Sequence, residues 1–450
     1  MGSNQIEADY TRLGVKIELP DKRSFTINQF EQFVNEAVRE VFGTCGPIVK
    51  VSEYIESQNR GSVIATGSEI QQVWAALSSK GLFRGYRIAA HFHINRNRRV
   101  EFSLNKMGLV FLVFIPIIGF VIFLVGGLVL YFSLPSRRDF FFYKKHAVVT
   151  GGSKGIGFQL AAGLIERGCN VTIIARNVND LKKACESLEE LAIQRGQNQK
   201  VQWKSLDLTS NYEQIKKTFD ESAAELGPIE ILINNAGHSV QAPFSELPVD
   251  DFEKQMKINY LSAVYASRAV VEDMKSRKSG HISFVSSAAG QFAIFGYTAY
   301  SPTKFALRGF ADALHMELLP YRVNVGVLYP PNTDTEGFKV EIETMPEETK
   351  LISDSAGLFT PKFVAEAHLN DIADGNYATT IGLDGWMLGN LTAGASPEKS
   401  LPRAIVQAML AGIFRAITLV YLGYFNGIVK RCHRRKLTEE EEKRKARKRN

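Results

Sequence analysis

Hydrophobic and polar positions divide the chain into a mixed amino-terminal segment, a long apolar run, a large block with a repeating pattern and a second apolar stretch near the end. In the large block, residues 144–399, short apolar runs alternate with stretches of helical periodicity, as in parallel strands joined by helical crossovers. The pattern predicts six strands, at 146–150, 171–175, 201–206, 229–234, 281–286 and 323–329. The predicted fold is therefore α/β, a Rossmann-type doubly wound parallel sheet with flanking helices.

Residues 1–106 have a different pattern. Alternating apolar positions predict strands around 15–19, 49–54, 63–66 and 86–92, and helical stripes predict helices over 30–41 and 69–77. This order fits a small α+β module of the ferredoxin-like type. Through residues 61–64 and 74–77 it weakly resembles the small protein-subunit family of ribonuclease P and MRP, which implies an RNA partner. Arg84, Arg87 and the cluster 96–99 are either phosphate contacts or a solvated basic edge.

Two stretches favour membrane contact. Residues 107–136 are thirty consecutive uncharged residues, and a helix needs only about 20 to cross a bilayer, so they predict a transmembrane segment. The second stretch, 404–429, is interrupted by Arg415, which costs at least ~2.5 kcal/mol at the centre of a span. Two short segments forming a hairpin, or an interfacial helix, therefore fit 400–430 better than one span. The charged tail 431–450 is either a solvated, disordered end or a contact for anionic lipid.

Composition excludes several classes of protein. The 450 residues are 45% hydrophobic and 22% charged, which is ordinary for globular domains. Four cysteines without Cys-x-x-Cys spacing argue against a disulfide scaffold or a zinc site, and His91 and His93 lack a third ligand, so no metal is predicted. The last 21 residues hold eleven basic and four acidic side chains, which accounts for the whole net charge of +7.

The two halves of the chain conflict in one respect. If the large block faces the cytosol, a single crossing at 107–136 would place residues 1–106 in the lumen, away from any RNA-processing partner. Since Met107 begins the apolar run, our hypothesis is that residues 1–106 and 107–450 are two adjoining reading frames, or that translation starts at Met107. Amino-terminal sequencing of the endogenous protein tests this hypothesis, and a single species beginning at Met1 would contradict it.

The first predicted strand of the large block is followed by a glycine-rich turn and then by a helical pattern. This strand–turn–helix order is typical of a phosphate-binding site. Gly151 suits a positive φ, Gly155 lets the backbone approach a pyrophosphate, and Gly157 allows close packing of helix and sheet. Arg176 ends the second strand, where a guanidinium suits a 2′-phosphate, and Lys154 in the turn adds a second cation. The sequence therefore favours NADPH, although a surface arginine without a ligand is the alternative.

Tyr300 and Lys304 lie four residues apart, and so share one face of a predicted helix. A nearby ammonium favours the phenolate, so we expect it to lower the tyrosine pKa from ~10 and to make the phenol a general acid and base. Ser287 follows the fifth strand and is a candidate to hold a substrate carbonyl. Because Ser286 precedes it directly, the sequence leaves a one-residue ambiguity between the two.

Residues 145–337 resemble the short-chain dehydrogenase/reductase family, through the glycine turn, the motif at 234–237, the serine pair and Tyr300 with Lys304. The resemblance implies that Tyr300 protonates a carbonyl oxygen, that Lys304 also holds the nicotinamide ribose, and that Asn259 completes a proton relay. It further implies that Asp207 contacts adenine. The implied cofactor-binding residues are Gly151, Ser153, Lys154, Gly155, Ile156, Gly157, Arg176, Asp207, Asn234, Ala236, Gly237, Tyr300, Lys304, Pro330 and Thr335.

Residues 329–338, 351–353 and 412–423 are similar to one branch of this family, the 3-ketodihydrosphingosine reductases. Pro331, where many members of the family have glycine, is typical of that branch, whereas Asp180 replaces a lysine. The resemblance implies NADPH-dependent reduction of 3-ketosphinganine to sphinganine at the endoplasmic reticulum membrane, with the catalytic domain cytosolic. A membrane-bound reductase of retinoid or steroid ketones, and an RNA-binding adaptor with an inactive cofactor fold, are the alternatives.

Overall fold

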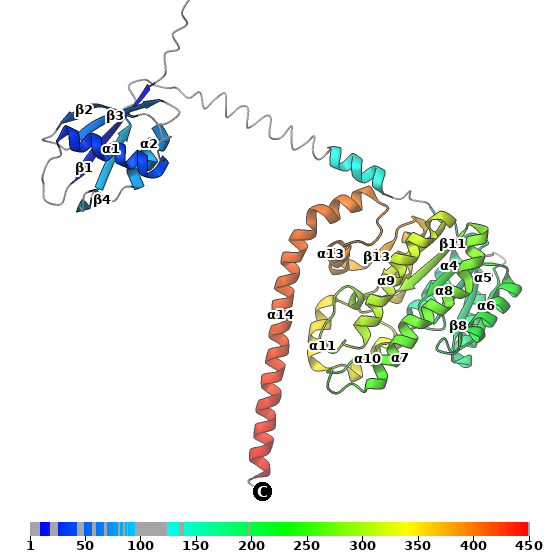
Figure 1. Ribbon diagram of the computed structural model, residues 1–450. Coiled ribbons are helices and arrows are strands. Elements are labelled where there is room, and N and C mark those ends of the chain that lie inside the picture. Colours follow the sequence, from blue (N-terminus) through cyan, green and yellow to red (C-terminus); the bar gives the residue numbers. More distant parts are fainter. Residues whose placement is uncertain are drawn as a thin grey trace, which may run out of the picture. The chain divides into compact units, whose positions relative to one another are not determined.

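The computed structural model describes residues 10–18, 26–42, 49–55, 60–66, 70–79, 82–83, 86–87, 89–94, 124–134, 139–196 and 199–448. The chain divides into two compact units, Met1–Ile118 and Gly119–Asn450, which are considered separately below (Figure 1).

The amino-terminal unit confirms the ferredoxin-like prediction. Its main elements are β1 (Tyr10–Glu18), α1 (Ile27–Phe42), β2 (Lys50–Ile55), β3 (Arg60–Thr66), α2 (Ile70–Ser79) and β6 (Ala89–Ile94). The four strands form one sheet in the order β2-β3-β1-β6, and the pairs are antiparallel. Apolar side chains of both helices, such as Phe30, Phe33 and Val73, pack with Val63 of β3 into the core of this unit.

One strand prediction in this unit is wrong. The stretch expected as a single strand over 86–92 is divided, because β5 (Tyr86–Arg87) turns back on β4 (Leu82–Phe83) and only β6 pairs with β1. Of the basic residues that we considered for phosphate contact, Arg84 and the cluster 96–99 lie outside the described residues.

The second unit contains a seven-stranded parallel sheet in the order β13-β12-β11-β10-β7-β8-β9, and so confirms the predicted doubly wound α/β fold. Its strands are β7 (His146–Thr150), β8 (Asn170–Ala175), β9 (Val201–Ser205), β10 (Ile229–Asn234), β11 (Gly280–Val285), β12 (Val323–Tyr329) and β13 (Ala378–Thr380). The last, β13, was not among the six predicted strands. It has only three residues, which is too short for a recognisable period.

Helices cover both faces of this sheet, as Figure 1 shows. One face packs against α4 (Gly155–Glu166), α5 (Val178–Gln194) and α12 (Pro361–Ala373), and the other against α6 (Tyr212–Leu226), α8 (Ser262–Arg277) and α9 (Tyr300–Leu318). Neighbouring strand residues enter opposite cores, because side chains alternate across a strand: Val149 packs on the first face and Val148 on the second. Burial on both faces explains why the strands read as continuous apolar runs.

A buried histidine joins the missed strand to the sheet. The His368 ring on α12 is hydrogen-bonded to Ser283 of β11 and, at 2.9 Å, to Thr379 of β13. Burial lowers the pKa of His368 to about 4, so the ring is neutral at pH 7.

Acidification should therefore destabilise this unit. The folded pKa of His368 lies below the ordinary value of about 6.5, so the unfolded chain takes up a proton first and stability falls between pH 6.5 and 4. We expect His368 alone to cost about 1 kcal/mol at pH 5.5. Urea unfolding gives the free energy of unfolding of the wild type and of His368→Gln at pH 7.5 and at pH 5.5. The wild type should lose more of this free energy on acidification than the variant, and the difference is the cost of His368, because the other buried histidines contribute equally to both proteins. An identical loss on acidification in the two proteins would contradict the prediction.

The membrane predictions meet the structure only in part. Residues 107–123 lie outside the described residues, and the rest of the predicted segment contains a short apolar helix, Leu124–Ser133. Among the described residues, one helix, α14 (Leu401–Arg447), is long and apolar enough to cross a membrane. Of the two arrangements predicted for 404–429, a hairpin or an interfacial helix, the hairpin is wrong, because α14 is continuous.

Tertiary contacts explain the continuity of α14. One face of the helix, including Phe414, Ile428 and Cys432, is buried against the rest of the second unit, while Arg415 is exposed. Figure 1 shows α14 running past α13 (Gly382–Thr392) and α11 (Glu347–Ser353). Beyond the apolar part, Lys436 pairs with the buried Glu348 of α11 at 2.6 Å, and Arg435 pairs with the neighbouring glutamate. The charged tail is therefore helical to Arg447 rather than disordered.

Candidate active site

A cavity of about 800 Å³ lies at the carboxyl end of the parallel sheet. Its walls come from the glycine turn after β7, the ends of β8, β11 and β12, the start of α9, helix α10 (Glu336–Thr344), and one face of α14. Of the predicted site residues, the following line it: Gly151, Ser153, Lys154, Gly155, Ile156, Gly157, Arg176, Ala236, Gly237, Ser286, Ser287, Tyr300, Lys304, Pro330 and Thr335.

The glycine turn has the geometry of a phosphate cradle. Gly151 and Gly155 have positive φ values of 65° and 55°, which favour glycine. A Cβ atom on Gly157 would lie 2.2 Å from the Gly151 carbonyl oxygen, so no larger residue fits there. The Asn235 Nδ2 holds the turn by donating to the carbonyl oxygens of Thr150 at 3.0 Å and Gly151 at 3.2 Å. Helix α4 begins at this turn, with its amino terminus at the cavity. A helix amino terminus in this position fits the pyrophosphate of a dinucleotide.

Two cationic side chains at this end of the cavity differ in their ion-pair partners. Arg176 is exposed at the end of β8 and has no ion pair among the described residues. Lys154, in contrast, lies 3.1 Å from Asp180 and 3.2 Å from Glu336. The carboxylates compete with any phosphate for Lys154, so Arg176 is the more available partner of a 2′-phosphate. Asp180, which replaces a lysine of the related branch, thus weakens Lys154 as a phosphate ligand.

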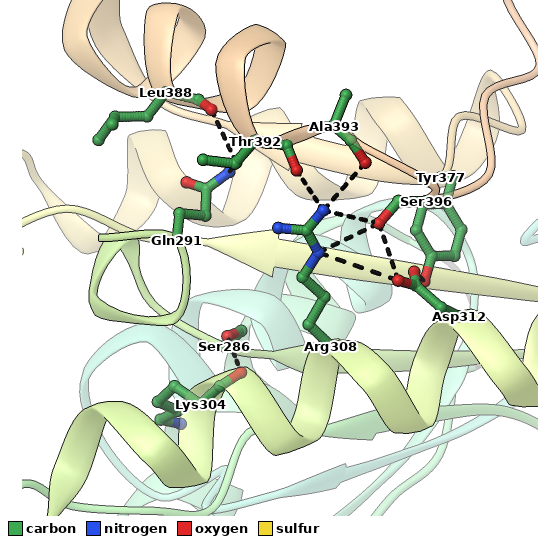
Figure 2. Close-up of polar contacts among 10 residues, drawn as sticks. All are labelled: Ser286, Gln291, Lys304, Arg308, Asp312, Tyr377, Leu388, Thr392, Ala393 and Ser396. Atoms are coloured by element: carbon green, nitrogen blue, oxygen red, sulfur yellow. Dashed lines mark hydrogen bonds and ion pairs between the residues drawn. The ribbon is translucent and has the colours of Figure 1, made fainter. Parts of the chain in front are cut away.

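The structure distinguishes the two serines. The Ser286 hydroxyl is buried and donates to the Lys304 carbonyl oxygen at 3.0 Å (Figure 2). Ser287 instead lines the cavity together with Tyr300, and its side chain acts to lower the pKa of the phenol. Ser287 is therefore the better placed of the two to share a substrate oxygen with the phenol, while Ser286 fixes the start of α9.

The electrostatics of Tyr300 differ from the expectation. Burial raises its pKa above the ordinary value, the charge of Glu341 raises it further, and the Ser287 side chain opposes both. The predicted lowering by Lys304 is wrong for this geometry. The Lys304 ammonium lies 5.7 Å from the Tyr300 ring centre and donates to the Val285 carbonyl oxygen at 2.9 Å. Burial lowers the pKa of Lys304 to about 8, so the amine is still mostly protonated at pH 7.

Asn259 lies behind the cavity wall, in the π-helical segment Lys257–Leu261. Its side chain makes two hydrogen bonds of 3.0 Å with the backbone of His238. A Cβ atom on Gly237 would lie 2.5 Å from the Asn259 Oδ1 and 3.5 Å from the Lys304 Nζ, so the amide and the ammonium approach the same glycine. The relay role of Asn259 stays a prediction.

Two predicted cofactor residues do not line the cavity. The Asn234 amide donates to the Ser267 hydroxyl at 3.2 Å and is buried beside α8, so of the two adjacent asparagines Asn235 is the one that lines the cavity. Asp207 is exposed and accepts from the Thr209 backbone N–H at 2.9 Å, which lowers the pKa of its carboxyl. The adenine contact proposed for Asp207 stays a prediction.

An arginine holds the far wall of the cavity in place. Arg308 of α9 donates to the carbonyl oxygens of Thr392 and Ala393, which end helix α13 (Figure 2). Helix α13 contributes Met387 and Leu388 to the cavity. These two hydrogen bonds therefore fix the position of that wall relative to α9, the helix that carries Tyr300. A single arginine thereby connects two segments that lie more than 80 residues apart.

Sequence reasoning missed two parts of the site. Glu341 of α10 lines the cavity, but nothing in the local sequence distinguishes it from its acidic neighbours. Five residues of α14 form an apolar wall, which we call the α14 wall: Phe414, Ile417, Thr418, Tyr421 and Phe425. Their spacing of three, four and seven is that of one helical face, a signal that was available in the sequence.

Comparison with known proteins agrees with this geometry. A sequence model of the short chain dehydrogenase family matches residues 145–345. The 3-dehydrosphinganine reductase of Danio rerio is 46% identical over 287 residues, which are 64% of this chain and 86% of that protein, and the 3-ketodihydrosphingosine reductase of Bos taurus gives the same values. A PIGF/3-ketodihydrosphingosine reductase fusion protein of Schizosaccharomyces pombe is 34% identical over 267 residues, 58% of this chain and 52% of that protein. This chain belongs to the short-chain dehydrogenase/reductase family of nicotinamide-dependent oxidoreductases.

Proposed function

We propose that this protein reduces 3-ketosphinganine to sphinganine with NADPH. The observation that carries the proposal is the α14 wall, which places an apolar helical face in the same cavity as Tyr300 and Ser287. A long alkyl chain can lie against that wall while its ketone reaches the phenol. The names of the relatives support the same reaction.

The residues of this chain divide the work of reduction. Ser287 and Tyr300 hold the carbonyl oxygen, and Tyr300 transfers its phenolic proton to that oxygen as negative charge develops there. Lys304, with Asn259 behind Gly237, restores the proton of the phenolate that remains. A bound reduced nicotinamide would supply the hydride for the carbonyl carbon. The ketone thereby gains a hydride and a proton and becomes a secondary alcohol.

The choice of NADPH rests on Arg176, the unpaired cation beside the glycine turn. A guanidinium recognises a phosphate through several directed hydrogen bonds, whereas NADH offers only a ribose hydroxyl at that position. Lys154 contributes less, because Asp180 and Glu336 already neutralise it.

Two opposite substitutions test the cofactor assignment. Arg176→Ala should lower the preference for NADPH over NADH by about 10- to 100-fold, the range for hydrogen bonds to a charged group. Asp180→Asn should raise it by a few-fold, because the substitution releases Lys154. Measurement of kcat/KM with both cofactors gives the ratio for each variant. An unchanged ratio in Arg176→Ala would refute the role of Arg176.

Membrane association is part of the proposal. Besides its buried face, α14 exposes apolar side chains that include Met409, Ile413, Leu419 and Val420. Such a face suits the boundary between head groups and acyl chains, where the substrate itself resides. Together with the apolar run 107–136, it supports attachment to a membrane. We propose that this is the endoplasmic reticulum membrane, with the catalytic unit on the cytosolic side.

The substrate assignment is tested with the full chain in detergent. With NADPH, 3-ketosphinganine should give a higher kcat/KM than a panel of retinoid and steroid carbonyl compounds. Turnover of those compounds without turnover of the sphingoid ketone would overturn the assignment in favour of another membrane-bound reductase.

The α14 wall is tested by two matched substitutions on the same helix. Ile417→Asn, inside the cavity, should raise KM for 3-ketosphinganine by about 10-fold or more, because it removes apolar contact with the alkyl chain. Val420→Asn is the control, since Val420 is 74% exposed and outside the cavity. Equal effects of the two changes would contradict a specific role of the wall.

The family match begins at residue 145 and does not reach the amino-terminal unit. RNA contact by residues 1–106 and their separate translation therefore stay predictions. Amino-terminal sequencing remains the test of the second.

A further inference from the structure

The proposed substrate carries a charge close to the reacting carbon. In 3-ketosphinganine a primary ammonium is bonded to the carbon next to the ketone, so a site that reduces this ketone holds a cation near its proton donor. An isolated ammonium is costly to remove from water unless a partner compensates it. The cavity should therefore contain a carboxylate close to Tyr300.

Three carboxylates line the cavity among the residues that the structure describes: Glu336, Glu341 and Asp384. The side chain of Glu336 is 76% exposed and paired with Lys154 at the glycine turn, the end that suits the cofactor. Asp384 lies in the first turn of α13 on the far wall. Only Glu341 couples electrostatically to both Tyr300 and Lys304.

Glu341 is held in place by neutral groups. The Gln241 Nε2 donates to its Oε2 at 3.2 Å and to the Ser239 hydroxyl at 2.6 Å, and Ser239 acts to lower the pKa of the carboxyl. Gln241 also reaches the Tyr297 hydroxyl at 3.5 Å, and the rings of Tyr297 and Tyr300 pack edge to face with centres 5.5 Å apart. Within the described part of the chain, no lysine or arginine forms an ion pair with Glu341.

The field of this carboxylate acts on the catalytic pair. Its charge raises the pKa of Tyr300 and also raises the pKa of Lys304, against the effect of burial on the lysine. A bound ammonium would cancel the negative charge beside Tyr300 and so favour formation of the phenolate. Binding of the correct substrate would thereby assist the proton transfer.

From this arrangement, and building on the proposed function, we infer that Glu341 binds the ammonium group of the substrate and selects 2-amino ketones over plain long-chain ketones. The carboxylate accepts hydrogen bonds from the ammonium while Ser287 and Tyr300 hold the adjacent carbonyl oxygen. Glu341 is thus a residue that determines specificity for the amino group, distinct from the α14 wall, which contacts the alkyl chain.

The test compares two substrates that differ in the amino group alone, 3-ketosphinganine and 1-hydroxyoctadecan-3-one, with the full chain in detergent. Glu341→Gln should lower kcat/KM for the amino ketone by about 10- to 100-fold and change that for the deamino ketone by less than about 3-fold. Glu343→Gln, an exposed position two residues along α10, is the matched control and should change neither. Asp384→Asn tests the other candidate carboxylate. If Asp384→Asn loses the preference for the amino ketone over the deamino ketone while Glu341→Gln keeps it, the inference is overturned.

The outcomes separate this inference from the proposed function. If the wild type turns over neither sphingoid substrate, the proposed function fails. If it reduces both and Glu341→Gln lowers both equally, the reduction stands and the role of Glu341 is refuted. A binding measurement requires no variant: octadecylamine should compete with substrate at least about 10-fold better than octadecanol in the wild type, and equal competition would also refute the inference.

Discussion

Replacing Tyr300 with phenylalanine should lower kcat for 3-ketosphinganine by about 10²- to 10⁴-fold, the contribution of a positioned general acid. The hydroxyl is the group that Ser287 contacts, and its loss removes the proton that the carbonyl oxygen needs. KM should change little, because the ring and its edge-to-face packing with Tyr297 remain. Steady-state kinetics with saturating NADPH measure the effect.

Burial raises the pKa of Tyr300 above its ordinary value, so the phenol is protonated at neutral pH, which is the form required for reduction. Tyr265→Phe serves as the control, since the Tyr265 ring packs on Tyr212 outside the cavity. If Tyr300→Phe retains more than about a tenth of the wild-type kcat, another group supplies the proton.

Substituting Gly157 with alanine should strongly weaken cofactor binding. The new methyl group would lie 2.2 Å from the Gly151 carbonyl oxygen and 2.4 Å from the Asn235 Nδ2, so the turn must open or lose its asparagine clamp. Overpacking of this kind costs about 1–3 kcal/mol of stability. We expect the Kd for NADPH to rise by about 10-fold or more, measured by quenching of protein fluorescence or by calorimetry, because the same turn presents the backbone N–H groups to the pyrophosphate.

The same substitution elsewhere provides the control. A Cβ atom on Gly309 of α9 meets no atom within 4 Å, so Gly309→Ala should leave the Kd unchanged and stabilise the helix by about 0.5–1 kcal/mol. A Gly157→Ala protein with unaltered Kd and melting temperature would show that the turn adapts, and the phosphate-cradle assignment would lose its main support.

Prediction from sequence succeeded where the signal was local and periodic. The six predicted strands exist because burial on both faces requires continuous apolar runs, and the glycine turn was visible because positive φ and close approach leave glycine as the fitting residue. The seventh strand, β13, is defined by pairing with β12 and by the His368 bond to Thr379, neither of which leaves a local pattern.

The wrong predictions have a common cause. The hairpin at 404–429 was inferred from the cost of Arg415 in a bilayer, but α14 packs one face on the rest of the second unit and leaves Arg415 exposed. The pKa of Tyr300 was inferred from its spacing to Lys304, but the ammonium bonds to Val285 while burial and Glu341 act in the opposite direction. Both inferences used sequence neighbours where the decisive partners are distant in the chain.

The amino-acid sequence alone determined the order of the elements, the α/β class, the glycine turn and the placement of Tyr300 and Lys304 on one helical face, because each depends on residues within one or two turns of each other. The tertiary structure decided which serine meets Tyr300, how acidic that phenol is, and that Glu341 and the α14 wall share its cavity. Those features depend on burial and on contacts between distant segments, and the free energy of a charge or an apolar surface is set by the surroundings that folding creates.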